Sequence, residues 1–364
     1  MTGAKPDGAV PAAEERRGSA RGPRLPDHVA RLEVPTPYPV GPVNVYVVFG
    51  RRLTLVDVGP NTDDGEAALL DGLRELGLAP ADIEQIVITH PHVDHHGGLD
   101  RFLRRHPGAK VFAHWAAAPF FGGEPAARLG FYERWLTQTG LPAPLVQASL
   151  RGLAGLGMLE PKAKPHRWLQ DGDLLIMGDW VWRVLHTPGH SGAQVCLYHE
   201  PSGTMFTADH VLPDVSSNAI IEPPPAAGAG RPRTLVQYLD ALRRVAALPV
   251  RLALPGHGRP FADVAALVHQ RLDMHGRRLQ HLLRRLQDGP ATVFELARAM
   301  FAEASGQQLV LALSEVQGHL DVLEALEKVR SGPAPAGGDP AGALVYSAVG
   351  SGEADGAAPA GRAE

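Results

Sequence analysis

The stretch Ile86–Gly98, IVITHPHVDHHGG, decides the fold of this chain. Four of the 17 histidines, His90, His92, His95 and His96, fall close together in it. The apolar β-branched run before them predicts a buried strand, and the two closing glycines lead into a predicted helix. Imidazole and carboxylate groups are the ligands that zinc and similar metals prefer, whereas calcium and magnesium favour oxygen alone. The loop therefore predicts a metal site; the alternative is a polar surface loop rich in histidine.

Composition limits the class of protein. A chain of 364 residues, 44% hydrophobic and 20% charged, predicts a soluble protein with one large and one smaller domain. The net charge of -4 provides no overall basic field for nucleic acid or an anionic membrane. The single cysteine, Cys196, excludes an internal disulfide and fits a reducing compartment. Residues 1–28 and 349–364 are predicted to be disordered tails, and no apolar run is long enough to span a bilayer, so we expect a cytoplasmic protein.

Two β-rich segments precede the histidine loop. Val43–Phe49 and Leu53–Val58 are separated by a Gly-Arg-Arg turn, which predicts an antiparallel hairpin. Asp57 lies near the end of the second segment. Its carboxylate either orients a metal ligand or caps the next turn, and both interpretations stay open here. Apolar residues at helical spacing over 63–76 then predict a helix that leads to the strand before the loop.

Residues from about 115 to 165 differ in composition from the segments around them. Aromatic and leucine residues are spread there among glycines and prolines, which predicts a helical insertion between core strands. A long insertion often forms a lid or a substrate wall, and its aromatic content suits an apolar or acyl group. The alternative is an insertion that only packs against the rest of the protein and does not contact the substrate.

Three later loops carry further candidate ligands. Each follows a predicted strand, and a glycine beside each histidine lets the backbone turn sharply. A carboxylate at a strand end can bridge two metal ions through its two oxygens. The candidates are His190 in HTPGHS, Asp209 in FTADH and His257 in LPGHG. His114 is expected to be structural, His186 is expected to be structural or to support a ligand from outside, and the role of His210 stays open.

Taken together, HPHVDH at residues 90–95, TPGHS around His190, Asp209 and PGHG around His257 resemble the metallo-β-lactamase superfamily, over about residues 34–261. The resemblance implies an α/β fold, an αββα sandwich with a dinuclear metal site at one edge of its two sheets. It implies that His90, His92 and His190 hold the first metal, that Asp94, His95 and His257 hold the second, and that Asp209 bridges them.

The implied cofactor is a pair of divalent metal ions, with no organic cofactor. We expect Zn²⁺, although Fe or Mn would use the same ligands. Two cations that share a water lower its pKa enough to leave a hydroxide near neutral pH. Asp94 and Asp209 are the candidate catalytic carboxylates that accept or relay the proton. Because Cys196 takes no ligand position, the site looks unlike that of many true β-lactamases and closer to glyoxalase II, the hydroxyacylglutathione hydrolase.

The remainder of the chain predicts a second domain. We expect the catalytic domain to cover residues 29–262 and a small helical domain to cover 263–348. Three predicted helices and a closing strand favour a winged helix, as in the endoribonuclease-like branch of the superfamily. Acidic residues on its last helix make a poor surface for a phosphate backbone, so no DNA partner is expected and the domain is interpreted as packing or forming a homodimer. Those residues are Glu315, Asp321, Glu324 and Glu327.

The helix before them is basic. It either binds an anionic substrate beside the active site or is a solvated face, which is the commoner case. Its arginines are Arg271, Arg277, Arg278, Arg284 and Arg285.

Three functions compete at this point. The leading prediction is hydrolysis of a small ester-type substrate, above all a thioester. The second is metal-dependent cleavage of single-stranded RNA with the same hydroxide. The third is a non-catalytic regulator that binds nucleic acid through the winged helix, and the complete ligand set speaks against it.

Overall fold

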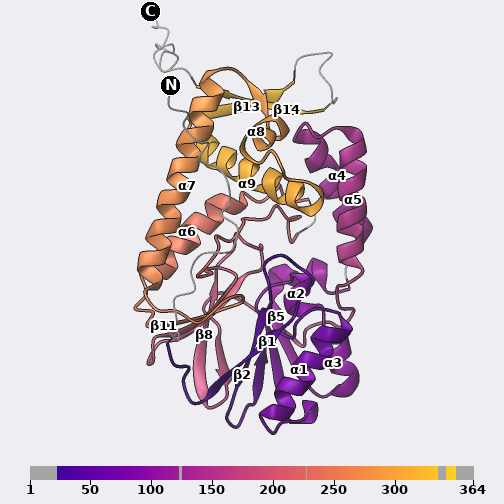
Figure 1. Cartoon of the computed structure of the whole chain (residues 1–364), viewed down its shortest axis with the longest axis vertical. Helices are drawn as coiled ribbons and strands as arrows, with labels where there is room; N and C mark the ends of the chain where they lie inside the picture. The colour runs from indigo at the N-terminus through magenta and orange to yellow at the C-terminus, as the bar shows by residue number, and fades with distance from the viewer. Residues whose placement is uncertain (1–22, 123–124, 227, 335–341, 350–364) are drawn as a thin grey trace, which may run out of the picture.

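The computed structural model describes residues 23–122, 125–226, 228–334 and 342–349. Two β-sheets pack face to face with helices on both outer sides, which confirms the predicted αββα sandwich (Figure 1). The predicted tails lie mostly at 1–22 and 350–364, outside the described residues. Within the described ranges, none of the helices is long and apolar enough to cross a bilayer.

The first sheet contains six strands, in the spatial order β1 (Val29–Val34), β2 (Val43–Val48), β3 (Thr54–Val56), β4 (Gln85–Ile88), β5 (Lys110–His114) and β6 (Arg167–Leu169). β2 and β3 pair antiparallel, which confirms the predicted hairpin. β4 runs parallel to both β3 and β5, so the carboxyl ends of all three strands meet at one edge. The sequence did not indicate β1, because its VARLEV segment carries charged residues at two of six positions.

The second sheet contains five strands, in the spatial order β11 (Leu252–Pro255), β10 (Thr204–Ala208), β9 (Val195–His199), β8 (Trp180–His186) and β7 (Leu174–Met177). β8, β10 and β11 agree with the strands predicted before the three later loops. β10 and β11 are parallel and buried along their whole length, so the loops that follow them also open at a shared edge.

Four helices cover the outer faces: α1 (Asp63–Glu75) and α3 (Leu99–Arg105) on the first sheet, α6 (Thr234–Ala246) and α7 (Val264–Gln287) on the second. Alternation along β2 explains why both its faces are covered. Val45 and Val47 belong to the cluster that includes α1 and α3. Tyr46 faces the other sheet, where its ring centroid lies 5.2 Å from that of Phe206.

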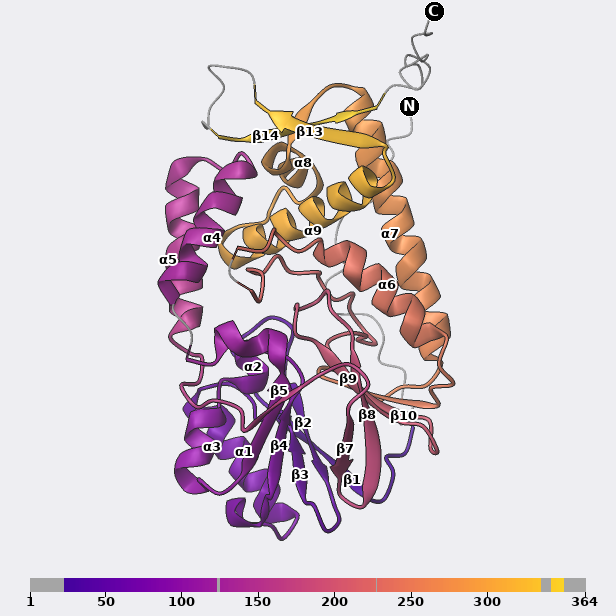
Figure 2. The same cartoon turned by 180° about the vertical axis from the view of Figure 1, so that it is seen from behind.

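After α7 the chain continues through β12 (Ala291–Thr292), α8 (Val293–Met300), α9 (Gly306–Ala325), β13 (Val329–Pro333) and β14 (Leu344–Ala348). The three strands form a small antiparallel sheet in the order β12-β14-β13. The predicted helices and closing strand are present, and the winged-helix assignment stays a prediction. Both views place this helical region over the end of the sandwich that carries α2 (Val93–His96) (Figures 1 and 2).

The predicted insertion is helical and consists of the 3₁₀ helix η2 (Trp115–Phe120), α4 (Pro125–Gln138) and α5 (Ala143–Gly157). Figure 2 shows α4 and α5 beside α9. Trp135 and Leu136 of α4 share one hydrophobic cluster with Leu313 of α9. The insertion and the C-terminal helices are therefore joined by a common core.

α9 is a buried helix, which corrects the reason given above for its poor fit to DNA. Glu315 and Asp321 do not form an outer surface, since both are buried. Arg278 of α7 donates to Glu315 at 2.5 Å, and Arg231 makes two hydrogen bonds of 2.6 Å to Asp321. The arginines of α7 do not form one basic face either, because Arg278 points inward while Arg277 is exposed.

Replacing Asp321 with alanine should lower the free energy of unfolding by about 2–3 kcal/mol, because Arg231 would lose its partner in a largely buried site. The Asp321 side chain is 0% exposed and that of Arg231 24%. Chemical denaturation measures the change. The control is Asp240→Ala, which removes an exposed pair with Arg243 and should change stability by less than about 1 kcal/mol. Equal effects of the two variants would contradict the role given to the buried pair.

Candidate metal centre

The histidine loop connects β4 to the single turn of α2. His90 lies just after the strand, and His92 is the residue that precedes the first turn of α2. The helical turn makes the side chains of the four histidines point in different directions. His96 points away from the others, donating from Nδ1 to the His92 carbonyl at 3.0 Å and packing its ring edge-on against Phe121. His90, His92 and His95 form a group of neighbouring rings.

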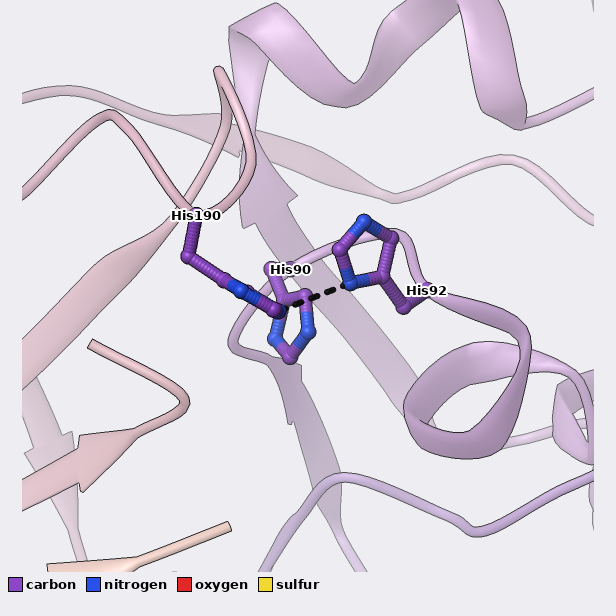
Figure 3. A group of neighbouring side chains, drawn as sticks. All are labelled: His90, His92 and His190. Carbon is purple, nitrogen blue, oxygen red and sulfur yellow. Dashed lines mark hydrogen bonds between the residues drawn. The ribbon is translucent and has the colours of Figure 1, made fainter. Parts of the chain in front are cut away.

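The three later loops bring their candidate residues to the same place. His190 follows β8, Asp209 follows β10 and His257 follows β11. His92 Nδ1 lies 2.9 Å from His190 Nε2, as the dashed line in Figure 3 marks. His257 Nε2 lies 3.2 Å from Asp94 Oδ2. Residues predicted from four separate motifs thus converge at one edge of the sandwich.

Asp209 lies between two sets of ligand atoms. Its Oδ2 is 3.5 Å from His190 Nε2 and 3.5 Å from His257 Nε2, and its Oδ1 is 3.4 Å from His95 Nε2. Within each set the ligand atoms lie no more than 4.8 Å apart. The structure therefore brings all seven predicted residues together, and the sets are His90, His92 and His190, and Asp94, His95 and His257.

Each of the five imidazoles has one nitrogen toward the centre and the other bonded outside it. Outward hydrogen bonds of this kind fix the tautomer and the ring orientation of a metal ligand. The outer contacts are His90 Nδ1 to Thr89 Oγ1 (3.0 Å), His92 Nε2 to Glu222 Oε1 (3.1 Å), His95 Nδ1 to Asp57 Oδ2 (2.8 Å), His190 Nδ1 to the Asn218 carbonyl (3.0 Å) and His257 Nδ1 to the Pro42 carbonyl (2.8 Å).

Several inward atoms have no hydrogen-bond partner although they are fully buried. They are His90 Nε2, His95 Nε2, His257 Nε2 and Asp209 Oδ1. A buried polar atom without a partner is costly, and such atoms rarely gather by chance. Converging nitrogen lone pairs and carboxylate oxygens form a donor set that suits zinc, iron or manganese. The residues present therefore fit a pair of divalent cations.

The charges of four of these groups agree with the donor set. Burial lowers the pKa of His90 well below its ordinary value and that of His190 to about 4, so both rings stay neutral. Burial opposes ionisation of Asp94, yet the neighbouring His95 holds its pKa at about 2. The pKa of Asp209 is held lower still by the imidazoles around it, again against burial. Neutral imidazoles and ionised carboxylates are the forms that bind metal. Against the effect of burial, the neighbouring carboxylates raise the pKa of His95 and His257, so metal binding there competes with protons.

Asp57 contacts His95, one of the candidate ligands, as the first of the two interpretations of its sequence position predicts. Besides its contact with His95, its carboxylate accepts from the backbone N–H and the hydroxyl of Thr89, both at 2.8 Å. Its φ is +64°, an uncommon value for a residue with a side chain. This backbone conformation places the carboxylate beneath the histidine loop.

Sequence reasoning missed Glu222. It lies at the start of EPPPAAGAGRPR, a proline-rich and glycine-rich stretch whose composition predicts a connector rather than a site. Its side chain is buried and contacts His92. A carboxylate directly after the apolar pair Ile220–Ile221 was the only local signal.

The other histidines do not join the seven. His114 stacks on His186 at 3.9 Å, and His186 donates to the Gly192 carbonyl, so both are structural as predicted. His210 is buried against the ring of Tyr238. A separate group, His275, Glu315 and His319, lies between α7 and α9. Because Arg278 already neutralises Glu315, that group is a polar network that joins the two helices.

Comparison with known proteins agrees with the site. Residues 38–257 match the family model of the metallo-beta-lactamase superfamily. The chain is 36% identical to the probable metallo-hydrolase YqjP of Bacillus subtilis over 310 residues, 84% of this chain and 95% of that protein. It is 33% identical over 175 residues to the acyl-coenzyme A thioesterase MBLAC2 of Gallus gallus, covering 46% of this chain and 57% of that one.

The solved structure of a metallo-beta-lactamase family protein of Thermus thermophilus, TTHA1429, superposes with a TM-score of 0.75. Its sequence is 31% identical, and the match covers 88% of this chain and 99% of the other. The similarity therefore extends beyond the sandwich into the C-terminal helical region. The chain belongs to the metallo-beta-lactamase superfamily, whose fold implies binding of divalent metal.

Proposed function

We propose that this metallohydrolase cleaves thioesters of small acyl groups, with two divalent cations held by the seven converging residues. The observation that carries the proposal is the position of Asp209, whose carboxylate lies within 3.5 Å of imidazole nitrogens from both sets. His90, His92 and His190 would hold one cation, and Asp94, His95 and His257 the other. Zinc is the expected metal, with iron or manganese as alternatives.

When bound, two such cations supply an activated water and an electrophilic site for the oxygen of the scissile group. The residues of this chain provide the rest of the chemistry. Asp94 and Asp209 are ionised carboxylates inside the site, and either can accept the proton that the water gives up. The outer partner of each imidazole directs the other ring nitrogen toward the centre.

The thioester assignment is supported by the likeness to MBLAC2, a protein described as an acyl-coenzyme A thioesterase. It agrees with the aromatic insertion next to the sandwich, since the Phe121 ring packs on His96 directly beside the histidine loop. Cleavage of single-stranded RNA would need an extended surface for phosphates. The inward-facing Arg278 and the buried α9 do not provide one.

Purified protein should release thiol from acyl-coenzyme A thioesters, contain about two metal ions per chain, and lose this activity on treatment with a chelator. A colorimetric thiol assay over acyl chains of increasing length, paired with elemental analysis, measures both. Restoring Zn²⁺ should restore turnover. Cleavage of single-stranded RNA without thioester turnover in the same series would contradict the substrate class. A protein that retains full activity after complete metal removal would contradict the mechanism.

A further inference from the structure

Residues Ser217 to Glu222 lie between the metal-facing loops and α9. On the side of the loops, Ser217 Oγ donates to the Asp209 carbonyl at 2.5 Å, and the Asn218 carbonyl accepts from His190 Nδ1 at 3.0 Å. Glu222 ends the segment and binds His92. This short stretch, called here the 217–222 segment, thus contacts three of the seven converging residues from outside.

The other side of the 217–222 segment is fixed to the C-terminal helical region. Asn218 Nδ2 donates to the carbonyl of Leu311 in α9 at 2.9 Å. The backbone N–H of Ile221 donates to Ser314 Oγ of α9 at 3.3 Å, and the Ile221 side chain is buried in the same cluster as Leu313. The position of Glu222 is therefore set by a helix that begins far beyond the last candidate ligand.

The hydrogen bonds of Glu222 define which nitrogen of His92 carries a proton. Oε2 accepts from the Ser191 hydroxyl at 2.9 Å and from the Gly192 backbone N–H at 2.7 Å. Oε1 lies 3.1 Å from His92 Nε2. Because an ionised carboxylate only accepts, His92 must donate from Nε2, and its Nδ1 keeps the lone pair that faces His190 Nε2.

We propose that Glu222 is a positioning residue of the metal centre and that α9 holds it in place through the 217–222 segment. His92 alone among the five histidines faces the centre with Nδ1 rather than Nε2. It alone therefore needs an outer partner that holds a proton on Nε2, and the buried carboxylate of Glu222 is that partner. The inference rests on the proposed metal site and adds to it the group that selects the ligand atom.

The substitution that tests the proposal is Glu222→Gln, which keeps the shape of the side chain. The Gly192 N–H, which can only donate, keeps the amide oxygen of Gln at the Oε2 position. The amide NH₂ then faces His92 Nε2 and donates to it, which favours a proton on Nδ1, the nitrogen that should bind the metal. We expect about 10- to 100-fold weaker binding of the zinc ion that His90, His92 and His190 would hold. Competition with a chromophoric chelator, using full-length protein and Zn²⁺ alone, measures it.

Glu315→Gln is the matched control, since it makes the same change at a buried carboxylate outside the centre. It should lower stability and leave both zinc affinities unchanged. A milder variant, Ser314→Ala, removes the hydrogen bond between α9 and the Ile221 backbone. It should also weaken zinc binding, by a factor several-fold smaller than that of Glu222→Gln. Unchanged zinc affinity in Glu222→Gln would overturn the role of Glu222, and unchanged affinity in Ser314→Ala alone would overturn the role of α9.

If Glu222→Gln yields no folded protein, the native chain still decides. Histidine-selective ¹⁵N NMR of the zinc-loaded protein should show His92 bound through Nδ1 with a proton on Nε2, and binding through Nε2 would overturn the inference. The two proposals fail in different ways. Native protein that binds no zinc contradicts the proposed function, whereas native protein with two zinc ions and an unaffected Glu222→Gln variant contradicts only the role of Glu222.

Discussion

Replacing Asp209 with alanine should abolish thioester hydrolysis, with a loss of at least about a thousandfold in kcat/KM. The carboxylate lies within 3.5 Å of inward nitrogens from both sets of imidazoles, so the variant removes the one residue that the two sets share. Stabilisation by a correctly held metal pair is worth several kcal/mol in the transition state, and about 1.4 kcal/mol corresponds to tenfold in rate. Initial-rate kinetics on the zinc-loaded protein measure the loss.

The fold should survive that change, because Asp209 lies at the edge of the sandwich, after the last residue of β10. Circular dichroism and thermal unfolding check this. His92→Ala should give a similar loss of turnover with the fold intact, while the exposed Asp240→Ala variant should be as active as the native protein. Soluble Asp209→Ala protein with native specific activity would refute the assigned role.

Removing residues 265 to 350 should leave a chain that does not fold cooperatively. Trp135, Leu136, Leu141 and Val146 of the insertion would lose most of the cluster that buries them, together with Ile221 of the 217–222 segment. Exposing a large apolar side chain costs about 1.5–3 kcal/mol, so these losses approach the roughly 5–15 kcal/mol that stabilises a whole domain. Size-exclusion chromatography and calorimetry should show aggregation or no thermal transition.

A single substitution separates loss of packing from loss of function. Leu313→Ala in α9 removes one fully buried side chain of the shared cluster and should cost about 2–5 kcal/mol while zinc binding persists at low temperature. A monodisperse truncated protein with undiminished thioesterase activity would show that the C-terminal helical region contributes neither to the core nor to the site.

The seven candidate ligands were predictable because each lies within a few residues of a strand end, where an apolar run is followed by glycine or proline. His90, His190 and His257 all stand in such positions, so local sequence contains the signal. The hairpin followed from the local β-rich segments, whereas the αββα sandwich followed from the resemblance to the metallo-β-lactamase superfamily. The fold is confirmed and the candidate ligands lie together, while their binding of metal stays a prediction.

What the sequence did not reveal depends on distant partners. Glu222 contacts His92, which lies 130 residues away, and the buried Asp321 is paired with Arg231 across 90 residues. A glutamate before three prolines and an aspartate on an amphipathic helix have ordinary surface explanations. No local pattern distinguishes them from exposed carboxylates, and the acidic face expected on α9 was wrong for this reason.

Trp135 and Leu136 leave the ribosome long before Leu313, the partner that covers them. At roughly 5–20 residues per second of synthesis, the apolar face of α4 stays uncovered for on the order of ten seconds. Exposed surface of this kind promotes aggregation and attracts chaperones. Glu222 and His257 also emerge late, so the nascent chain depends on protection until α9 is complete, and its metal centre is assembled only near the end of synthesis.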